Sequence, residues 1–286
     1  MTETVSAPNQ SALYVVATPI GNLGDMVPRA IETLQTVDVI AAEDTRHSAR
    51  LLSHFGIQTP LLAYHDHSDG RQVQALVARL LSGESVALIS DAGTPLVSDP
   101  GYRLVRRARE AGVRVVPVPG ACALVAALSA SGLPSDRFSF EGFLPPKSGQ
   151  RQNRLQTLVA ETRTLIFYEA PHRIEECLAD MALAFGAERE AVLARELTKT
   201  FETIVGGSLQ SLCEFVAADP NQRRGEMVLM VRGREADAGE GLDEDARRIM
   251  TILLAELSVK QASQLAAEIT GVRKKLLYQW ALEQQP

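Results

Sequence analysis

At 286 residues the chain is long enough for two compact domains, and its 45% hydrophobic and 22% charged content is that of a globular protein. The net charge of -6 argues against a protein that coats nucleic acid indiscriminately, because such binding rests on an excess of Lys and Arg; a local basic groove is not excluded. The apolar runs are too short to span a bilayer, and the few cysteines form no CxxC pair. We therefore expect no membrane association, no disulfide framework and a cytoplasmic location.

The first part of the chain has the pattern of an α/β domain. After a polar start, residues 1–12, which we expect to be a disordered tail, the first domain is expected over residues 13–122. Apolar, β-branched runs predict strands, and helical spacing between them predicts helices. The predicted strands are residues 13–17, 37–41, 86–90 and 114–118, and the predicted helices are residues 27–34, 69–81 and 102–111. This alternation implies a mostly parallel sheet with helices on both faces.

A second α/β domain is expected over residues 123–233. The pattern breaks at residues 138–147, which contain Pro, Gly and Phe, and then resumes. The predicted strands are residues 164–168, 191–195, 200–205 and 226–231. The second and third of these strands are too close for a crossover helix, so we expect them to be antiparallel and the sheet to be mixed. The small and charged residues 233–241 are typical of a linker.

The last part, residues 242–286, is expected to be helical. Ser258 is placed to cap a helix, and Gly271 interrupts the helical pattern after it. One apolar face of that helix is predicted at Ala262, Leu265, Ala266 and Ile269. Short helices with a tight glycine turn are typical of a helix-turn-helix, but a small packing appendage is an equal alternative.

Two segments of the first domain are suited to bind a ligand. The segment Thr18-Pro-Ile-Gly-Asn-Leu-Gly-Asp25 follows the first strand and precedes a helix that Asp25 would cap; its two glycines let backbone approach a ligand. The segment Ser90-Asp-Ala-Gly-Thr-Pro-Leu-Val-Ser-Asp-Pro-Gly101 follows another strand, at the carboxyl edge where open α/β sheets bind ligands. Neither GxGxxG nor a P-loop occurs in the chain. A plain turn is the alternative for the first segment, and binding is favoured for the second.

Other strand ends carry small or charged residues. Pro117-Val-Pro-Gly-Ala-Cys-Ala123 leaves room for a flat ligand, although the segment taken by itself favours close helix–sheet packing. Charged groups follow strands in Glu43-Asp-Thr-Arg46, Phe167-Tyr-Glu-Ala-Pro-His-Arg173 and Arg195-Glu-Leu-Thr-Lys-Thr200. Cations such as His172 and Arg173 near a helix N-terminus are misplaced unless they serve an anionic partner. Surface salt bridges are the alternative. The histidines lack partners at metal-ligand spacing, so no metal is expected.

These segments, in this order, resemble the ribosomal RNA small subunit methyltransferase I family, within the wider tetrapyrrole methylases. The resemblance covers about residues 13–233 and includes Gly225-Glu-Met227; the tail resembles the helix-turn-helix-like extension of the same family. It implies a two-domain tetrapyrrole-methylase-like α/β fold, the class III type of methyltransferase, with a small C-terminal helical extension. It further implies a homodimer that binds S-adenosylmethionine between its domains. The implied substrate is the ribose 2′-hydroxyl of a cytidine in the decoding region of 16S rRNA, within the 30S subunit.

The segments and the resemblance together give three sets of predicted site residues. The predicted cofactor-binding residues are Pro19, Asp91, Ala92, Gly93, Val97, Gly120, Ala121, Cys122, Ala123, Tyr168 and Met227. A ribose hydroxyl is a weak acid, so a base or a cation near it should help. The candidates for these roles are Glu43, Asp44, Arg46, Glu169, His172, Glu196 and Lys199. The predicted RNA-binding residues are Arg173, Arg195, Arg273, Lys274 and Lys275.

Two alternative functions stay open at the level of sequence. A small-molecule methylase of the same fold, acting on a tetrapyrrole, is the nearer one, but the polar linker, the helical tail and its cations favour RNA. A non-catalytic nucleic-acid-binding protein that uses the tail helices is the other. The acidic balance and the several ligand-type loops at strand ends argue against it.

Overall fold

The computed structural model describes residues 11–65, 70–235 and 244–284. The chain forms two compact units, Met1–Gly233 and Arg234–Pro286. Most of the tail predicted at residues 1–12, the start of the helix predicted at residue 69, and most of the predicted linker lie outside the described residues.

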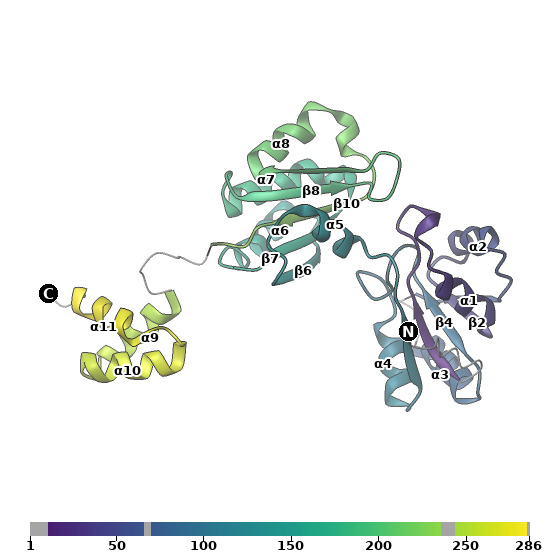
Figure 1. The fold of residues 1–286 in the computed structure, drawn as a ribbon, viewed down its shortest axis with the longest axis horizontal. Helices are drawn as coiled ribbons and strands as arrows, with labels where there is room; N and C mark the ends of the chain where they lie inside the picture. Colours follow the sequence, from purple (N-terminus) through teal and green to yellow (C-terminus); the bar gives the residue numbers. More distant parts are fainter. Residues whose placement is uncertain (1–10, 66–69, 236–243, 285–286) are drawn as a thin grey trace, which may run out of the picture. The chain divides into compact units, whose positions relative to one another are not determined.

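The first sheet is fully parallel and has the strand order β3-β2-β4-β1-β5. Its strands are β1 (Ala12–Val16), β2 (Val39–Ala42), β3 (Leu61–Ala63), β4 (Val86–Ile89) and β5 (Arg114–Val118). Figure 1 labels two central strands of this sheet, β2 and β4. The predicted strands are confirmed to within two residues. Ala12 belongs to β1 and is fully buried, so the predicted tail is one residue too long at this end. The sequence pattern missed β3 because this edge strand is short and largely exposed.

Helices cover both faces of this sheet, as predicted. They are α1 (Pro28–Thr36), α2 (Thr45–His54), α3 (Gly70–Leu81) and α4 (Tyr102–Glu110). Alternate residues of β2 enter different cores: Ile40 packs in the cluster that contains Leu34 and Leu52, and Val39 in the one that contains Leu76 and Leu104. Side chains of a strand alternate between the faces, so a strand buried on both sides must be apolar throughout.

The predicted cap of α1 is wrong. Asp25 ends a short 3₁₀ turn, η1 (Leu23–Asp25), which the side chain of Asn22 caps by accepting a hydrogen bond from the Gly24 amide. The helix α1 begins three residues later at Pro28, with Val27 at its N-cap and no side-chain cap. Proline suits the first turn because its missing N–H is unpaired there in any helix, so α1 needs no acidic cap to begin.

The second sheet has the order β6-β7-β10-β8-β9. Its strands are β6 (Phe138–Phe143), β7 (Thr164–Glu169), β8 (Glu190–Arg195), β9 (Thr203–Ser208) and β10 (Met227–Val231). The β6–β7 pair is parallel and the remaining pairs are antiparallel, which confirms a mixed sheet. The break predicted at residues 138–147 is wrong in its first half, because residues 138–143 form β6. A bulge between Phe140 and Gly142 disturbs the alternation that would have revealed this strand.

Each face of the second sheet has its own apolar layer. One face packs with α6 (Ser148–Gln156), α7 (Ile174–Phe185) and α8 (Leu209–Ala218). The other packs with α5 (Ala123–Ser131), through Leu124 and Leu128. Ile20, from the loop after β1, joins this second layer and so connects the two sheets. The packing of α5 on the second sheet agrees with a domain boundary near residues 122–123, which stays a prediction.

The C-terminal unit contains α9 (Glu244–Leu254), α10 (Val259–Thr270) and α11 (Lys274–Glu283), with an apolar core of its own. The predicted face of α10 is half wrong: Ala262 and Ala266 are buried, but Leu265 and Ile269 are 41% and 62% exposed. The small residues face the other helices because they allow the close approach that the larger ones would prevent. Ser258 is at the N-cap as predicted, but its hydroxyl bonds the Gln261 side chain instead of a backbone amide.

Candidate functional site

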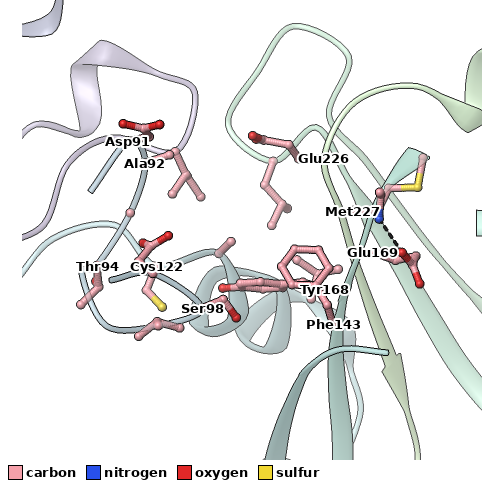
Figure 2. Close-up of a pocket in the computed structure, with 18 of the residues that line it drawn as sticks. Asp91, Ala92, Thr94, Ser98, Cys122, Phe143, Tyr168, Glu169, Glu226 and Met227 are labelled. Atoms are coloured by element: carbon pink, nitrogen blue, oxygen red, sulfur yellow. Dashed lines mark hydrogen bonds between the residues drawn. The ribbon is translucent and has the colours of Figure 1, made fainter. Parts of the chain in front are cut away.

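A pocket of about 470 Å³ lies between loops of the first sheet and strands of the second (Figure 2). Its volume falls within the range of roughly 300–1,000 Å³ typical of small-molecule sites. The wall from the first sheet comes from the loops that follow β1, β2, β4 and β5. These loops meet at the carboxyl edge, where the strand order places β1 between β4 and β5, the position at which open parallel sheets bind ligands.

Hydrogen bonds tie these loops together. The backbones of Thr18 and Gly93 exchange two hydrogen bonds of 2.8 and 3.0 Å. The Thr94 hydroxyl donates to the carbonyl of Ala121 at 3.0 Å, and the Asp44 amide donates to Asp91 Oδ1 at 3.1 Å. These bonds join the loops after β1, β2, β4 and β5 into one continuous wall.

Backbone strain gathers in the two loops that face each other across the pocket. Leu96 and Ser98 have φ values of +74° and +63°, and Glu196 and Thr198 have values of +51° and +66°. Side-chain-bearing residues rarely adopt this left-handed region, and strain of about 1–3 kcal/mol each persists mainly at functional sites. Ser98, in the first loop, and Leu197, between the strained residues of the second, both line the pocket.

The pocket is acidic. Glu43, Asp91, Asp99, Glu169 and Glu226 line it, and none of the described residues that line it is basic. Burial raises the pKa of Asp99 to about 6; a hydrogen bond with Ser90 opposes the rise and the nearby charge of Asp91 adds to it. A cation in this pocket would be attracted by the carboxylates and would favour the ionised form of Asp99.

Aromatic side chains form the opposite wall. Tyr168 and Phe143 both line the pocket, with ring centroids 5.8 Å apart in an edge-to-face arrangement (Figure 2). The Tyr168 hydroxyl accepts a hydrogen bond from the Leu124 amide at 3.1 Å, in the first turn of α5. Burial raises the pKa of Tyr168, so the phenol stays neutral in the physiological range.

The structure brings most of the predicted cofactor-binding residues together. Those that line the pocket are Asp91, Ala92, Gly93, Val97, Cys122, Ala123, Tyr168 and Met227. Pro19, Gly120 and Ala121 do not line it. A Cβ on Gly120 would lie 2.9 Å from the Cβ of Ala17, so this glycine serves close packing, the alternative considered from the sequence. Contact with a cofactor stays a prediction for all of these residues.

Of the predicted catalytic residues, Glu43 and Glu169 line the pocket. The Glu169 side chain is fully buried and pairs with Arg173 at 3.2 Å. The side chain of Asp44 caps α2. The backbone amides of His47 and Arg46 donate hydrogen bonds to its carboxylate and so lower the pKa of Asp44. The side chains that do not line the pocket are those of Asp44, Arg46, His172, Glu196 and Lys199.

Lys199 forms an ion-pair network beside the pocket. Its ammonium lies 2.9 Å from both Glu196 Oε1 and Glu226 Oε2. Burial opposes its charge, but the hydrogen bonds to the two carboxylates prevail and raise the pKa of Lys199. Burial likewise disfavours ionised Glu196, yet the bond from Lys199 lowers the pKa of this carboxyl. Lys199 is therefore a cation at neutral pH and cannot act as a base.

The predicted RNA-binding residues fall into two groups. Arg173 donates to the carbonyls of Leu144 and Pro145, and the buried Arg195 donates to the carbonyl of Arg224. These internal contacts hold the segments that follow β6 and precede β10. The other group is Arg273, Lys274 and Lys275, which are exposed at the start of α11. An RNA contact stays a prediction for both groups, and the exposed group is the better placed for it.

Sequence reasoning missed several residues of the pocket. Ile20, Thr94, Ser98, Asp99, Ala170, Pro171, Leu197 and Glu226 line it and lie inside the segments that the sequence pattern singles out. Phe143 and Val228 also line it. The composition of the segments was the available signal, but it does not tell which side chains face inward.

The part of the chain that the structure describes shows neither a metal centre nor a membrane-spanning helix. No group of three or more His, Cys, Asp or Glu side chains there could hold a metal ion. Within residues 11–65, 70–235 and 244–284, no helix is both long and apolar enough to cross a membrane.

Comparison with known proteins shows the family of the chain. Residues 12–213 match the family described as Tetrapyrrole (Corrin/Porphyrin) Methylases, and residues 240–285 match the RsmI C-terminal HTH domain. A Pseudomonas aeruginosa protein named ribosomal RNA small subunit methyltransferase I is 62% identical over 274 residues, which cover 96% of this chain and 97% of that protein. Its namesake from Escherichia coli O157:H7 is 56% identical over 286 residues, 100% of both chains. The chain belongs to the ribosomal RNA small subunit methyltransferase I family.

Solved structures agree on the fold. The methyltransferase CobJ superposes with a TM-score of 0.58 at 19% identity, covering 78% of this chain and 94% of that one. Diphthine synthase gives a TM-score of 0.58 at 14% identity, covering 77% and 90%. The predicted tetrapyrrole-methylase-like fold with a helical extension is confirmed, and so is the prediction of an enzyme: a member of the ribosomal RNA small subunit methyltransferase I family is a methyltransferase.

Proposed function

We propose that the enzyme transfers a methyl group from S-adenosylmethionine to the ribose 2′-hydroxyl of a cytidine in the decoding region of 16S rRNA. The acidic pocket at the edge of the parallel sheet is the observation that carries the choice of donor. S-adenosylmethionine carries two positive groups, a sulfonium and an ammonium, and one negative carboxylate. Its net charge is therefore positive, and the carboxylates that line the pocket attract it. The family membership supports an RNA substrate.

The residues present fit this donor. Asp91 and Asp99 supply negative charge, while Ala92, Gly93 and Ala123 leave space for the adenosine part against the backbone. When bound, the cofactor supplies a methyl group that is already activated on a sulfonium sulfur. The task of the protein is to hold the attacking oxygen in line with that group, and such orientation supplies up to roughly 7–11 kcal/mol.

We assign to Glu43 the role of the base that accepts the proton of the attacking hydroxyl. It lines the pocket from the loop after β2, and its side chain is half-buried. Glu169 also lines the pocket but is fully buried against Arg173, which favours a structural carboxylate. Lys199 is paired with both Glu196 and Glu226, so its charge is already compensated and we assign it a structural role.

A tetrapyrrole substrate fits less well. Tetrapyrrole intermediates carry several carboxylate side chains, and the described residues that line the pocket contribute carboxylates and no cation to meet them. The C-terminal unit, with its exposed Arg273, Lys274 and Lys275, supports a substrate with phosphates. The proposed partner is therefore the 30S subunit, and the resemblance adds a homodimer to this proposal.

The test is methyl transfer to 30S subunits from a strain that lacks the modification. We expect radiolabel from S-adenosylmethionine to appear in 16S rRNA, and mass spectrometry of the nucleosides to place it on a ribose. Protein-free 16S rRNA should react at least about 10-fold more slowly, because a chain with a net charge of -6 has little non-specific attraction for RNA and must recognise local shape. Equal rates on the two substrates would contradict docking on the assembled subunit, and label on a base would contradict the ribose.

Asp99 should make donor binding depend on pH. Its pKa of about 6 means that it is ionised above this pH and neutral below it, so affinity for the cationic donor should rise as pH increases through about 6. Calorimetry from pH 5 to 8 should show this rise in the wild type, and the Asp99→Asn variant should bind weakly at every pH in this range. An identical pH profile in the variant would assign the titration to another group.

The raised pKa of Asp99 also has a consequence for the folding stability of the protein without bound donor. Because the pKa of Asp99 in the folded state is raised above its ordinary value of 3.8, the folded state binds the proton of this carboxyl more tightly than the unfolded state does. Asp99 therefore destabilises the free protein increasingly as pH rises from about 4 to about 6. Asp99→Asn should stabilise the free protein at pH 7 by about 1–2 kcal/mol, after a discount for partial exposure, as measured by denaturant unfolding.

A further inference from the structure

Phe143 is an aromatic residue that the fold does not require. Its side chain is 55% exposed, and it is absent from the apolar clusters formed by the described residues. Phe140 and Tyr168, by contrast, pack in the layer between the second sheet and α5. A single exposed apolar side chain is ordinary. The position of Phe143 is informative because its ring lines the pocket beside Tyr168 (Figure 2).

The bulge in β6 places Phe143 on the pocket face. In a regular strand Phe140 and Phe143 would point to opposite faces, because they are an odd number of residues apart. Phe140 pairs with Ile166 and Phe143 pairs with Tyr168, so the extra residue returns both rings to one side. Gly142 adopts a φ of +65° at this point, and the side chain of the extra residue, Glu141, is held by Arg154 at 2.6 Å. A shift of one residue in register would remove the ring from the pocket.

The charges of the pocket decide which part of an RNA can reach this ring. The carboxylates that line the pocket repel phosphate, and the described lining offers no basic residue to compensate. The nucleobase and ribose of a nucleotide are uncharged and can enter, whereas its phosphates must stay at the rim. Proteins that bind single-stranded RNA hold such an extruded base by stacking it on an aromatic side chain.

We propose that the ring of Phe143 is the surface on which the target nucleobase stacks, so that the attached ribose is presented to the wall formed by the loops of the first sheet, which carries Glu43. The inference rests on the proposed function and adds a substrate-positioning residue to it. Phe143 belongs to β6, whereas Ala92, one of the small residues assigned to the donor, belongs to the loop after β4 (Figure 2). Loss of the ring should therefore affect the RNA substrate and spare the donor.

The experiment compares Phe143→Ala, Phe143→Leu and Phe143→Tyr in the full-length enzyme. With 30S subunits that lack the modification, we expect Phe143→Ala and Phe143→Leu to lower kcat/KM about 10-fold, mainly through KM, and Phe143→Tyr to restore it. Affinity for S-adenosylmethionine, measured by calorimetry, should stay within about twofold of the wild type. The matched control is Phe138→Ala, in the same strand, 42% exposed and outside the pocket lining, which should leave both quantities unchanged.

Three results would overturn the inference. Unchanged kcat/KM in Phe143→Ala would show that the ring has no role, and full activity in Phe143→Leu would show that an apolar wall suffices without stacking. A loss of donor affinity as large as the loss in kcat/KM would assign the ring to the cofactor. In each case wild-type activity on 30S subunits leaves the proposed function standing, whereas an inactive wild type would refute that function and this inference together.

Discussion

A Gly93→Val variant will bind S-adenosylmethionine about 100-fold more weakly than the wild type, a loss of about 2.7 kcal/mol, and will remain folded. Gly93 has a φ of +82°, which a β-branched residue adopts only with strain. A Cβ there would lie 3.2 Å from Ile20 Cγ2, and the methyl groups beyond it would intrude on the pocket that Gly93 lines. Calorimetry gives the affinity, and circular dichroism checks the fold.

The matched control for this variant is Gly112→Val. Gly112 also has a positive φ, of +75°, but a Cβ there would meet nothing within 4 Å, and it lies in the turn between α4 and β5, outside the pocket lining. The two variants share the backbone strain and differ in position. We expect Gly112→Val to keep wild-type donor affinity. If both variants lose affinity equally, strain and not pocket shape is responsible; if neither does, the donor binds elsewhere.

Removal of residues 236–286 will leave donor affinity within about twofold and will lower kcat/KM on 30S subunits at least about 10-fold. The C-terminal unit has its own apolar core, which includes Met250 and Leu277, so its loss should not expose the core of the rest. Ending the chain at Glu235 keeps Gly233, which packs closely against the backbone of Thr162. Calorimetry and methyl transfer under identical salt conditions measure the two quantities.

A full-length variant with Arg273, Lys274 and Lys275 replaced by Gln tests the cause of this loss. These cations lie at the start of α11, and a helix N-terminus favours a nearby anion. A phosphate there would therefore be held by the cationic side chains and by the helix N-terminus together. The variant should reproduce most of the truncation's effect and show a shallower dependence on salt, by about one unit of slope for each phosphate that the variant no longer binds. Full activity in both variants would mean that the tail does not dock the enzyme, and weakened donor binding in the truncation would mean that the tail is part of the catalytic body.

The first sheet and its ligand loop were predictable because they are encoded locally. The run of buried residues in β4, followed by Ser90 through Gly101, already indicated a parallel strand that ends in a binding loop. A continuous apolar run and the small residues that follow it are properties of near neighbours in the chain. Asp91, Ala92, Gly93 and Val97 were found on the pocket wall for this reason.

The second wall could be predicted only in part. Tyr168 and Met227 were found, but Phe143 was missed because a bulge breaks the pattern of β6. Glu226 and Lys199 are 27 residues apart, and their ion pair exists because β8 and β10 are neighbours in the second sheet. No local pattern records which distant strand will pair with which.

By itself, the sequence determined the alternation of elements, the loops that end the strands and the glycines that give these loops room, because backbone preference and burial act over a few residues. Only the tertiary structure decided that Ile20, from the loop after β1, packs in the same layer as Leu124 and Val192, so that the two walls face each other across one pocket. It also decided which charged groups serve the pocket: Asp44 became a helix cap and Arg195 an internal support, while burial beside Asp91 raised the pKa of Asp99. The physical reason is that packing, desolvation and charge–charge distance depend on groups brought together from distant parts of the chain.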